Sequence, residues 1–95
     1  MVLSYDLLMP AVKRLVETRQ NWMYWQQKAE KSGDTYDKGR WFEEAGRYDG
    51  LLEAISSVTQ ENSAEWDARC QSTVEQITEK TDRYADDLLN SFGYV

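Results

Sequence analysis

Residues 39–54 decide how this chain folds, and they read GRWFEEAGRYDGLLEA. Apolar residues recur every three or four positions in this stretch and just after it, which places them on one face of a helix. They are Trp41, Ala45, Tyr48, Leu52 and Ile55. Beside that face, Gly46, Gly50 and Ala54 recur every four residues. A glycine inside a helix costs about 1 kcal/mol relative to alanine, so the stripe predicts a close helix contact at these positions.

The stripe of Gly46, Gly50 and Ala54 has two interpretations. It can pack against the neighbouring helix of the same chain, or two copies of this helix can cross in a homodimer. The sequence does not separate the two, and both stay open at this stage.

The periodicity predicts an all-α fold in a single domain, residues 1–95, with helices at about 6–32, 35–59 and 63–91. The first helix carries a seam with heptad spacing from Leu8 to Ala29. Either Asp6 or Pro10 marks its start. The short turn of residues 32–35 makes the first two helices an antiparallel hairpin, with Trp22 and Trp25 facing Trp41, Ala45 and Tyr48.

The third helix follows a polar break at residues 60–63, where Asn62 or Ser63 can cap it. No Gly or Pro stands in the break, so a helix continuous with the second is the alternative. The architecture is therefore either a three-helix bundle or an extended helical hairpin, as a monomer or a dimer.

Bulk composition limits the classes of partner. The chain of 95 residues has a net charge of −6, which disfavours direct contact with nucleic acid or an anionic membrane. Cys70 is the only cysteine, so no internal disulfide forms. The start of the chain lacks the pattern of a signal peptide, and no apolar stretch approaches the roughly 20 residues of a membrane span. We expect a cytoplasmic protein.

The residue content argues against an enzyme. The chain has no histidine and one cysteine, so imidazole-dependent catalysis and thiolate metal sites are not expected. Gly46 and Gly50 lie inside a helical pattern rather than after a strand, which does not suit a phosphate-binding loop. We expect no catalytic residues, no cofactor and no metal.

Two surfaces are candidates for binding another protein. The first is an aromatic patch of Met23, Tyr24 and Phe42, which lie off the apolar seams. Exposed aromatic residues supply hot spots at protein interfaces. Packing against the third helix is the alternative role for these side chains.

The second candidate is an acidic face in the last third of the chain. Residues 61–95 hold eight Asp or Glu and three Lys or Arg, a net charge of −5. Glu75, Glu79, Asp82 and Asp86 fall on one helical stripe, and Asp87 lies beside it. Such a stripe suits a basic partner, although a merely solvated face is the alternative.

The phrase Gly46-Arg47-Tyr48-Asp49-Gly50-Leu51-Leu52-Glu53-Ala54-Ile55, together with the small size, acidity and tryptophan content, resembles small acidic helical proteins of bacteriophages. These include anti-CRISPR proteins and other inhibitors of host defence. Beside this resemblance, the acidic face and the exposed aromatic residues lead us to expect a non-enzymatic module that binds and blocks a basic, nucleic-acid-handling host protein. The acidic stripe alone is too sparse to imitate a DNA duplex, unless a dimer or further carboxylates such as Asp67 and Asp87 add to it. The alternative function is a structural homo-oligomer packed through Gly46, Gly50 and Ala54.

Overall fold

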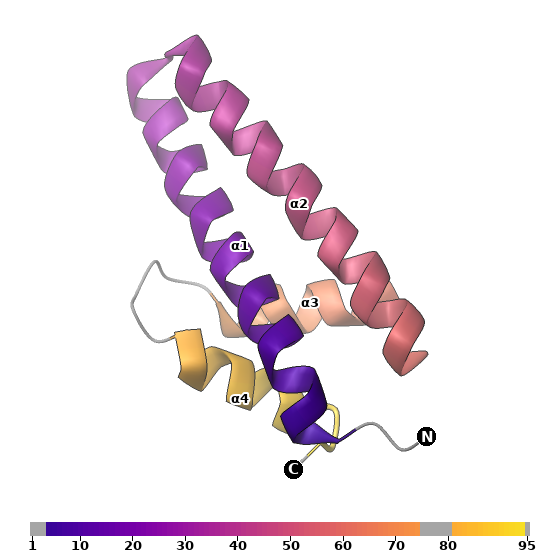
Figure 1. The fold of residues 1–95 in the computed structure, drawn as a ribbon. Coiled ribbons are helices and arrows are strands. Elements are labelled where there is room, and N and C mark those ends of the chain that lie inside the picture. The colour runs from indigo at the N-terminus through magenta and orange to yellow at the C-terminus, as the bar shows by residue number, and fades with distance from the viewer. Residues whose placement is uncertain (1–3, 75–80, 95) are drawn as a thin grey trace.

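The computed structural model describes residues 4–74 and 81–94, and the part that it describes is helical, without a strand (Figure 1). The all-α prediction is confirmed. The helices are α1 (Tyr5–Ser32), α2 (Thr35–Thr59), α3 (Ser63–Thr73) and α4 (Thr81–Ser91). The first two form the long antiparallel hairpin that the sequence predicts, with bounds within one residue of those expected.

The start of α1 lies earlier than either expected residue. The side chain of Ser4 accepts a hydrogen bond from the backbone N–H of Leu7 at 3.4 Å, which makes Ser4 the N-cap. Asp6 lies in the first turn, where a carboxylate favours the positive end of the helix dipole. Pro10 lies inside the helix, so neither Asp6 nor Pro10 caps it.

The turn between α1 and α2 follows the sequence signals. Gly33 has φ +66°, a left-handed conformation that glycine adopts without strain, and its N–H donates to the carbonyl of Ala29 at 2.9 Å. Asp34 then caps α2 by accepting from the N–H of Tyr36 at 2.9 Å. These contacts span at most four residues, which is why the local sequence predicts them.

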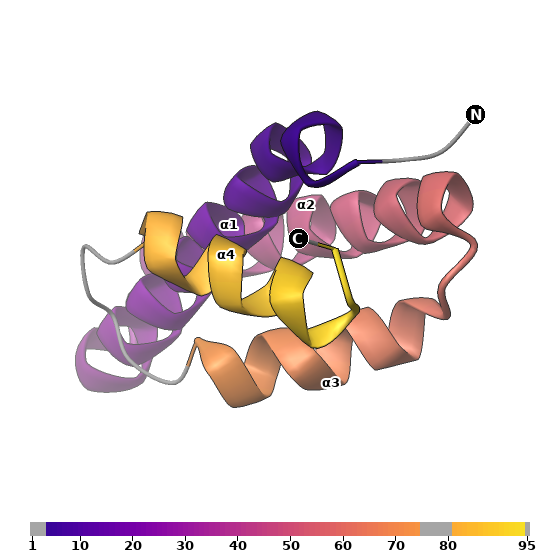
Figure 2. The same cartoon turned by 90° about the horizontal axis from the view of Figure 1, so that it is seen from below.

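The prediction of one third helix over residues 63–91 is wrong. Asn62 caps α3, as one of the two expected residues, but α3 ends at Thr73 and α4 begins at Thr81. Because α3 crosses the hairpin rather than running along it (Figure 1), a straight continuation to a length of about 43 Å would extend past the hairpin. The two short helices instead lie alongside each other across one side of the hairpin (Figure 2).

The core lies where all four helices meet, toward the open end of the hairpin. Trp66 of α3 is fully buried, its ring stacks on Phe92 with centroids 4.0 Å apart, and its indole N–H donates to Thr59 Oγ1 at 3.2 Å. From α4, Leu88 and Leu89 are fully buried in the same cluster. The largest aromatic ring of the core therefore comes from α3, not from the hairpin.

The closed end of the hairpin extends beyond α3 and α4 (Figure 1). Of the expected aromatic packing at this end, Trp22 does contact the buried Tyr48, with ring centroids 5.4 Å apart. Trp25 and Trp41 are only half-buried and contact other rings instead. The prediction of a four-ring packed cluster is thus correct only for Trp22 and Tyr48, because no third helix covers the outer turns.

Candidate functional site

The closed end of the hairpin carries a group of aromatic and cationic side chains that we call the tip cluster: Tyr24, Trp25, Lys28, Tyr36 and Arg40. The ring of Trp25 lies at its centre and meets Tyr24 and Tyr36 edge-on, at centroid distances of 5.2 and 6.1 Å. Lys28 Nζ and Arg40 Cζ lie 4.9 and 5.1 Å from the centroid of the same ring. Such contacts are cation–π interactions.

The tip cluster is ordered by its own contacts yet exposed to solvent. Tyr24 is 46% exposed and Tyr36 is 66% exposed. The rings come from the last turns of α1 and the first turn of α2, which the two-residue turn of Gly33 and Asp34 brings together. The result is a surface that presents Trp, Tyr and Arg side chains, which are residue types enriched at protein interfaces.

A second exposed aromatic pair lies one turn further along α2. The rings of Trp41 and Phe42 stack at an interplanar angle of 11°, with centroids 5.2 Å apart, and Phe42 is 65% exposed. Of the predicted aromatic patch, Tyr24 and Phe42 are exposed as expected. Met23 is not part of that surface, because it packs against the hydrophobic core.

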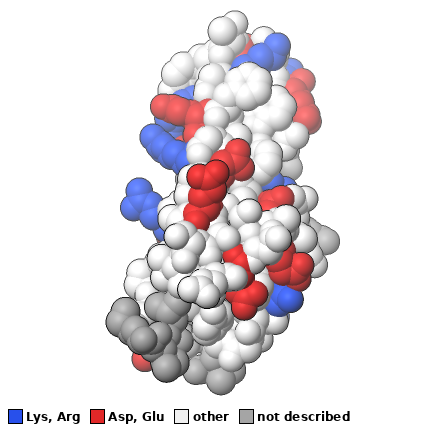
Figure 3. All heavy atoms as spheres, turned by 90° about the vertical axis from the view of Figure 1, so that its right-hand side faces the viewer, with Lys and Arg blue, Asp and Glu red and all other residues white. Residues whose placement is uncertain are grey.

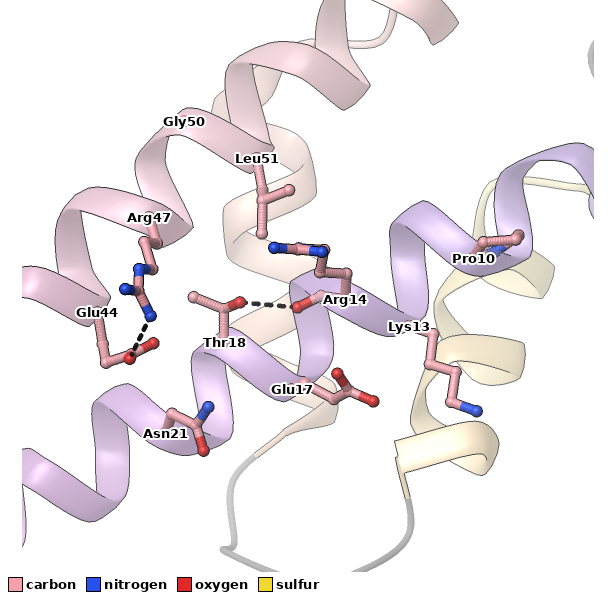
Figure 4. Close-up of a pocket in the computed structure, with 10 residues that line it drawn as sticks. All are labelled: Pro10, Lys13, Arg14, Glu17, Thr18, Asn21, Glu44, Arg47, Gly50 and Leu51. Atoms are coloured by element: carbon pink, nitrogen blue, oxygen red, sulfur yellow. Dashed lines mark hydrogen bonds and ion pairs between the residues drawn. The ribbon is translucent and has the colours of Figure 1, made fainter.

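A groove of about 800 Å³ lies between α1 and α2 (Figure 4), and we call it the α1–α2 groove. Arg14 and Glu17 line it from α1, while Glu44 and Arg47 line it from α2. The guanidinium of Arg14 reaches toward α2 and lies beside Leu51 in the close-up. The groove is therefore lined by charged groups of both signs together with the apolar side chains of Pro10 and Leu51.

Glu44 links the groove to the tip cluster. Its side chain is buried, and one carboxylate oxygen lies 3.1 Å from Nη1 of Arg47 and 3.7 Å from Nη2 of Arg40. Arg40 in turn lies over the ring of Trp25. A buried carboxylate needs such partners, since an unpaired buried charge is costly. The single carboxylate of Glu44 therefore pairs with the guanidinium groups of both Arg40 and Arg47.

The predicted acidic face is partly used inside the chain. Asp82 forms an ion pair with Lys13 of α1 at 2.8 Å. Asp86 accepts a hydrogen bond from the hydroxyl of Tyr5 at 2.6 Å, which raises the pKa of that tyrosine. The acidic stripe therefore does not point wholly to solvent, because two of its members connect α4 to α1. Asp87 is exposed.

Glu75 and Glu79, the other two members of the predicted acidic face, lie outside the described residues. The single helix that was expected to align all four carboxylates is divided at Thr73 and Thr81. An unbroken row of four carboxylates on one helix is therefore not what the described part of the chain presents.

The small-residue stripe faces solvent. A Cβ built at Gly46 or Gly50 has no heavy atom within 4 Å among the described residues, once the neighbouring helix backbone is set aside. Ala54 is also exposed. The predicted close contact within the hairpin is wrong, and the crossing of two copies stays a prediction. Figure 3, which looks onto the outward side of α2, shows scattered charges over a largely uncharged surface.

Sequence reasoning missed Trp25, Tyr36 and Arg40 as surface residues. Trp25 falls on the heptad seam of α1, and periodicity alone cannot tell where along the seam the covering helices stop. The signal that was present is the polar sequence around it, with Lys28 one turn after Tyr24 and Arg40 one turn after Tyr36. Arg14 and Arg47 carried no motif and were also missed.

Two observations concern metal and thiol chemistry in the described residues. Among them no group of three or more His, Cys, Asp or Glu could hold a metal ion. Burial raises the pKa of the Cys70 thiol to about 11, so the reactive thiolate is disfavoured near neutral pH. Among residues 4–74 and 81–94, no helix is long and apolar enough to cross a membrane.

Comparison of the chain with models of protein families, with curated proteins and with solved structures finds no match. The functional argument therefore depends on the surfaces of this molecule.

Proposed function

We propose that this protein is a non-enzymatic protein-binding module that contacts its partner through the closed end of the α1–α2 hairpin. The observation that carries the proposal is the exposure of Tyr24, Tyr36 and Phe42 on a part of the hairpin that α3 and α4 do not cover. Aromatic rings and arginine carry much of the binding energy at protein interfaces.

The tip is also suited to binding because its rings are already held in place. Ordering a mobile side chain on association costs about 0.5–1.5 kcal/mol. Trp25 is held between two tyrosines and two cations, and Phe42 stacks on Trp41, so much of this cost is met on folding. A partner gains apolar contact here without first having to order the surface.

The resemblance to small phage proteins suggests that the module blocks a host protein. The acidic face supports a basic, nucleic-acid-handling target less strongly than the tip supports protein binding in general. Asp82 pairs with Lys13 and Asp86 accepts a hydrogen bond from Tyr5, so both carboxylates already have partners within the chain. We therefore place the main contact at the tip and treat the acidic face as a secondary surface.

A homo-oligomer packed through α2 is the second candidate function. The favouring observation is that Gly46, Gly50 and Ala54 are exposed with open space around the glycines, so a second copy of α2 can approach their backbone closely. Phe42 precedes Gly46 by four residues and Gly50 lines the α1–α2 groove, so the two surfaces adjoin. The two functions are distinguished by the measurement: self-association depends on protein concentration, whereas binding of another protein is detected by its capture.

The test of the proposed function is an affinity pull-down from bacterial lysate, read by mass spectrometry, with matched variants. The tip variant changes Tyr24, Tyr36 and Phe42 to Ala. The control variant changes Leu7 and Val58 to Ala, because these exposed apolar residues, at 62% and 57%, lie far from the tip. We expect the control to retain the partner of the wild type and the tip variant to lose it.

Circular dichroism should show both variants folded, since exposed positions alter stability by about 0.5 kcal/mol each at most. A tip variant that captures the same partner as the wild type would show that the aromatic surface is not the binding site.

A further inference from the structure

We propose that the α1–α2 groove binds an acidic segment of the partner, with partner carboxylates paired to Arg14 and Arg47 and an apolar side chain placed against the tip cluster. This inference rests on the proposed function, because it names the chemistry of the partner that the hairpin tip would bind. It also reverses the expectation from net charge, which favours a basic partner.

The first step is that the groove and the tip cluster form one continuous surface. Arg47 lines the groove and pairs with the buried Glu44, whose carboxylate also lies 3.7 Å from Arg40. Arg40 lies over the ring of Trp25, which contacts Tyr36. A segment lying in the groove therefore reaches the exposed rings without crossing a gap of unrelated surface.

The second step is the local charge. The groove is lined by three cations and two carboxylates, although the whole chain has a net charge of −6. The tip cluster adds Lys28 and Arg40, and over residues 24–43 around it four Asp or Glu balance four Lys or Arg. The combined surface is therefore positive by one, and this charge comes from the groove. A positive surface on an acidic protein attracts a negative segment and repels basic ones.

The third step asks which of these cations can accept a new partner. Lys13 is paired with Asp82 at 2.8 Å. Arg47 shares the single carboxylate of Glu44 with Arg40 and is otherwise exposed. Arg14 forms no ion pair with any described residue. Arg14 and Arg47 thus have guanidinium N–H groups available for a partner. The planar guanidinium can bind a carboxylate through two parallel hydrogen bonds.

The remaining charged group of the groove, Glu17, opposes this binding. It is exposed on α1 three residues from Arg14, without an ion pair among the described residues. An acidic segment has to lie near this carboxylate, which weakens its binding. Glu17 therefore gives the test a second direction, because removing its charge should strengthen the interaction that loss of Arg14 weakens.

The experiment is a selection of random 16-residue peptides, displayed on phage, against the immobilised full chain. We expect the recovered peptides to be rich in Asp and Glu and to contain an aromatic or aliphatic anchor. One recovered peptide, synthesised with a fluorescent label, is then titrated by anisotropy against the wild type and charge variants. Its affinity should fall steeply when salt is raised.

The charge variants are matched in pairs. Arg14→Glu should weaken the peptide by at least about tenfold, whereas Arg83→Glu, the same change on the exposed face of α4, should leave it nearly unchanged. Glu17→Lys should strengthen it severalfold, whereas Glu53→Lys, the same change at an exposed position of α2 outside the groove, should not. Arg14→Gln, which keeps the stem of the side chain, should give an intermediate loss.

Recovery of basic peptides or of none overturns the inference, and so does an equal effect of Arg14→Glu and Arg83→Glu. The proposed function fails separately, when the tip variant with Tyr24, Tyr36 and Phe42 changed to Ala binds the selected peptides as well as the wild type does. If the tip variant loses the peptides but the Arg14 variants keep them, the tip is a binding surface and the groove is not.

Discussion

Replacing Gly46 and Gly50 together by alanine should stabilise this protein. Both glycines lie inside α2 and face solvent. A Cβ at either position meets no described neighbour within 4 Å apart from the adjoining helix backbone. The substitutions therefore add helix propensity without adding a steric cost.

The magnitude follows from the propensity of the two residues. Glycine in a helix interior costs about 0.8–1.0 kcal/mol relative to alanine, so two replacements should add about 2 kcal/mol to the free energy of unfolding. For a domain of this size, this corresponds to a rise in melting temperature of roughly 8–15 °C. It also corresponds to a shift of the urea midpoint by about 1 M.

Gly33→Ala is the matched control, since it makes the same chemical change at a position with φ +66°. A non-glycine residue in the left-handed region costs about 1–2 kcal/mol, so the control should destabilise the chain. Urea denaturation followed by circular dichroism at 222 nm measures both. The melting temperature should be recorded at two protein concentrations, because self-association makes it depend on concentration.

A loss of stability in the Gly46→Ala, Gly50→Ala variant would refute this reasoning. If that loss came with a change from dimer to monomer in size-exclusion chromatography, the outward side of α2 would be a close contact between two copies. The homo-oligomer would then become the better function for this protein.

Two further predictions concern the core. Trp66→Ala should lower the free energy of unfolding by about 3–5 kcal/mol, because Trp66 is fully buried and stacks on Phe92. Trp41→Ala should lower it by only about 1 kcal/mol, because Trp41 is half-buried. Urea denaturation measures both variants, and equal losses of stability would contradict the burial argument. Burial raises the pKa of the Cys70 thiol from 9.0 to about 11, so between these pH values the folded chain binds more protons than the unfolded chain. The free energy of unfolding should therefore fall as pH rises, by roughly 3 kcal/mol in total. Cys70→Ala should flatten this fall between pH 8 and 11, and a profile parallel to that of the wild type would exclude the thiol as its source.

The hairpin could be predicted from the sequence because its determinants are local. The apolar seam of α1 repeats every three or four residues, and the hydrogen bonds of Gly33 and of the Asp34 cap span four residues or fewer. Hydrogen bonds of that range form in nearly the same way whatever the rest of the chain does. Asn62 marks the start of α3 by the same means.

The candidate site could be predicted only in part. Tyr24 and Phe42 were identified because they lie off the apolar seams, and both are exposed. Trp25 lies on the seam and was assigned to the interior. Helical phase says which side of a helix a residue occupies, but it does not say how far along that side the covering helices extend. The closed end of the hairpin extends beyond α3 and α4 (Figure 1), and Trp25, in the last turns of α1, is only half-buried.

The sequence by itself determined an all-helical chain with a long hairpin, whereas the tertiary structure decided which faces are covered. The division of the third helix allows α4 to return to α1, where Tyr5 meets Asp86 across a separation of 81 residues. That contact turns a predicted solvent carboxylate into a link between helices. Burial and pairing of this kind depend on the sum of many distant contacts, so no short stretch of sequence encodes them.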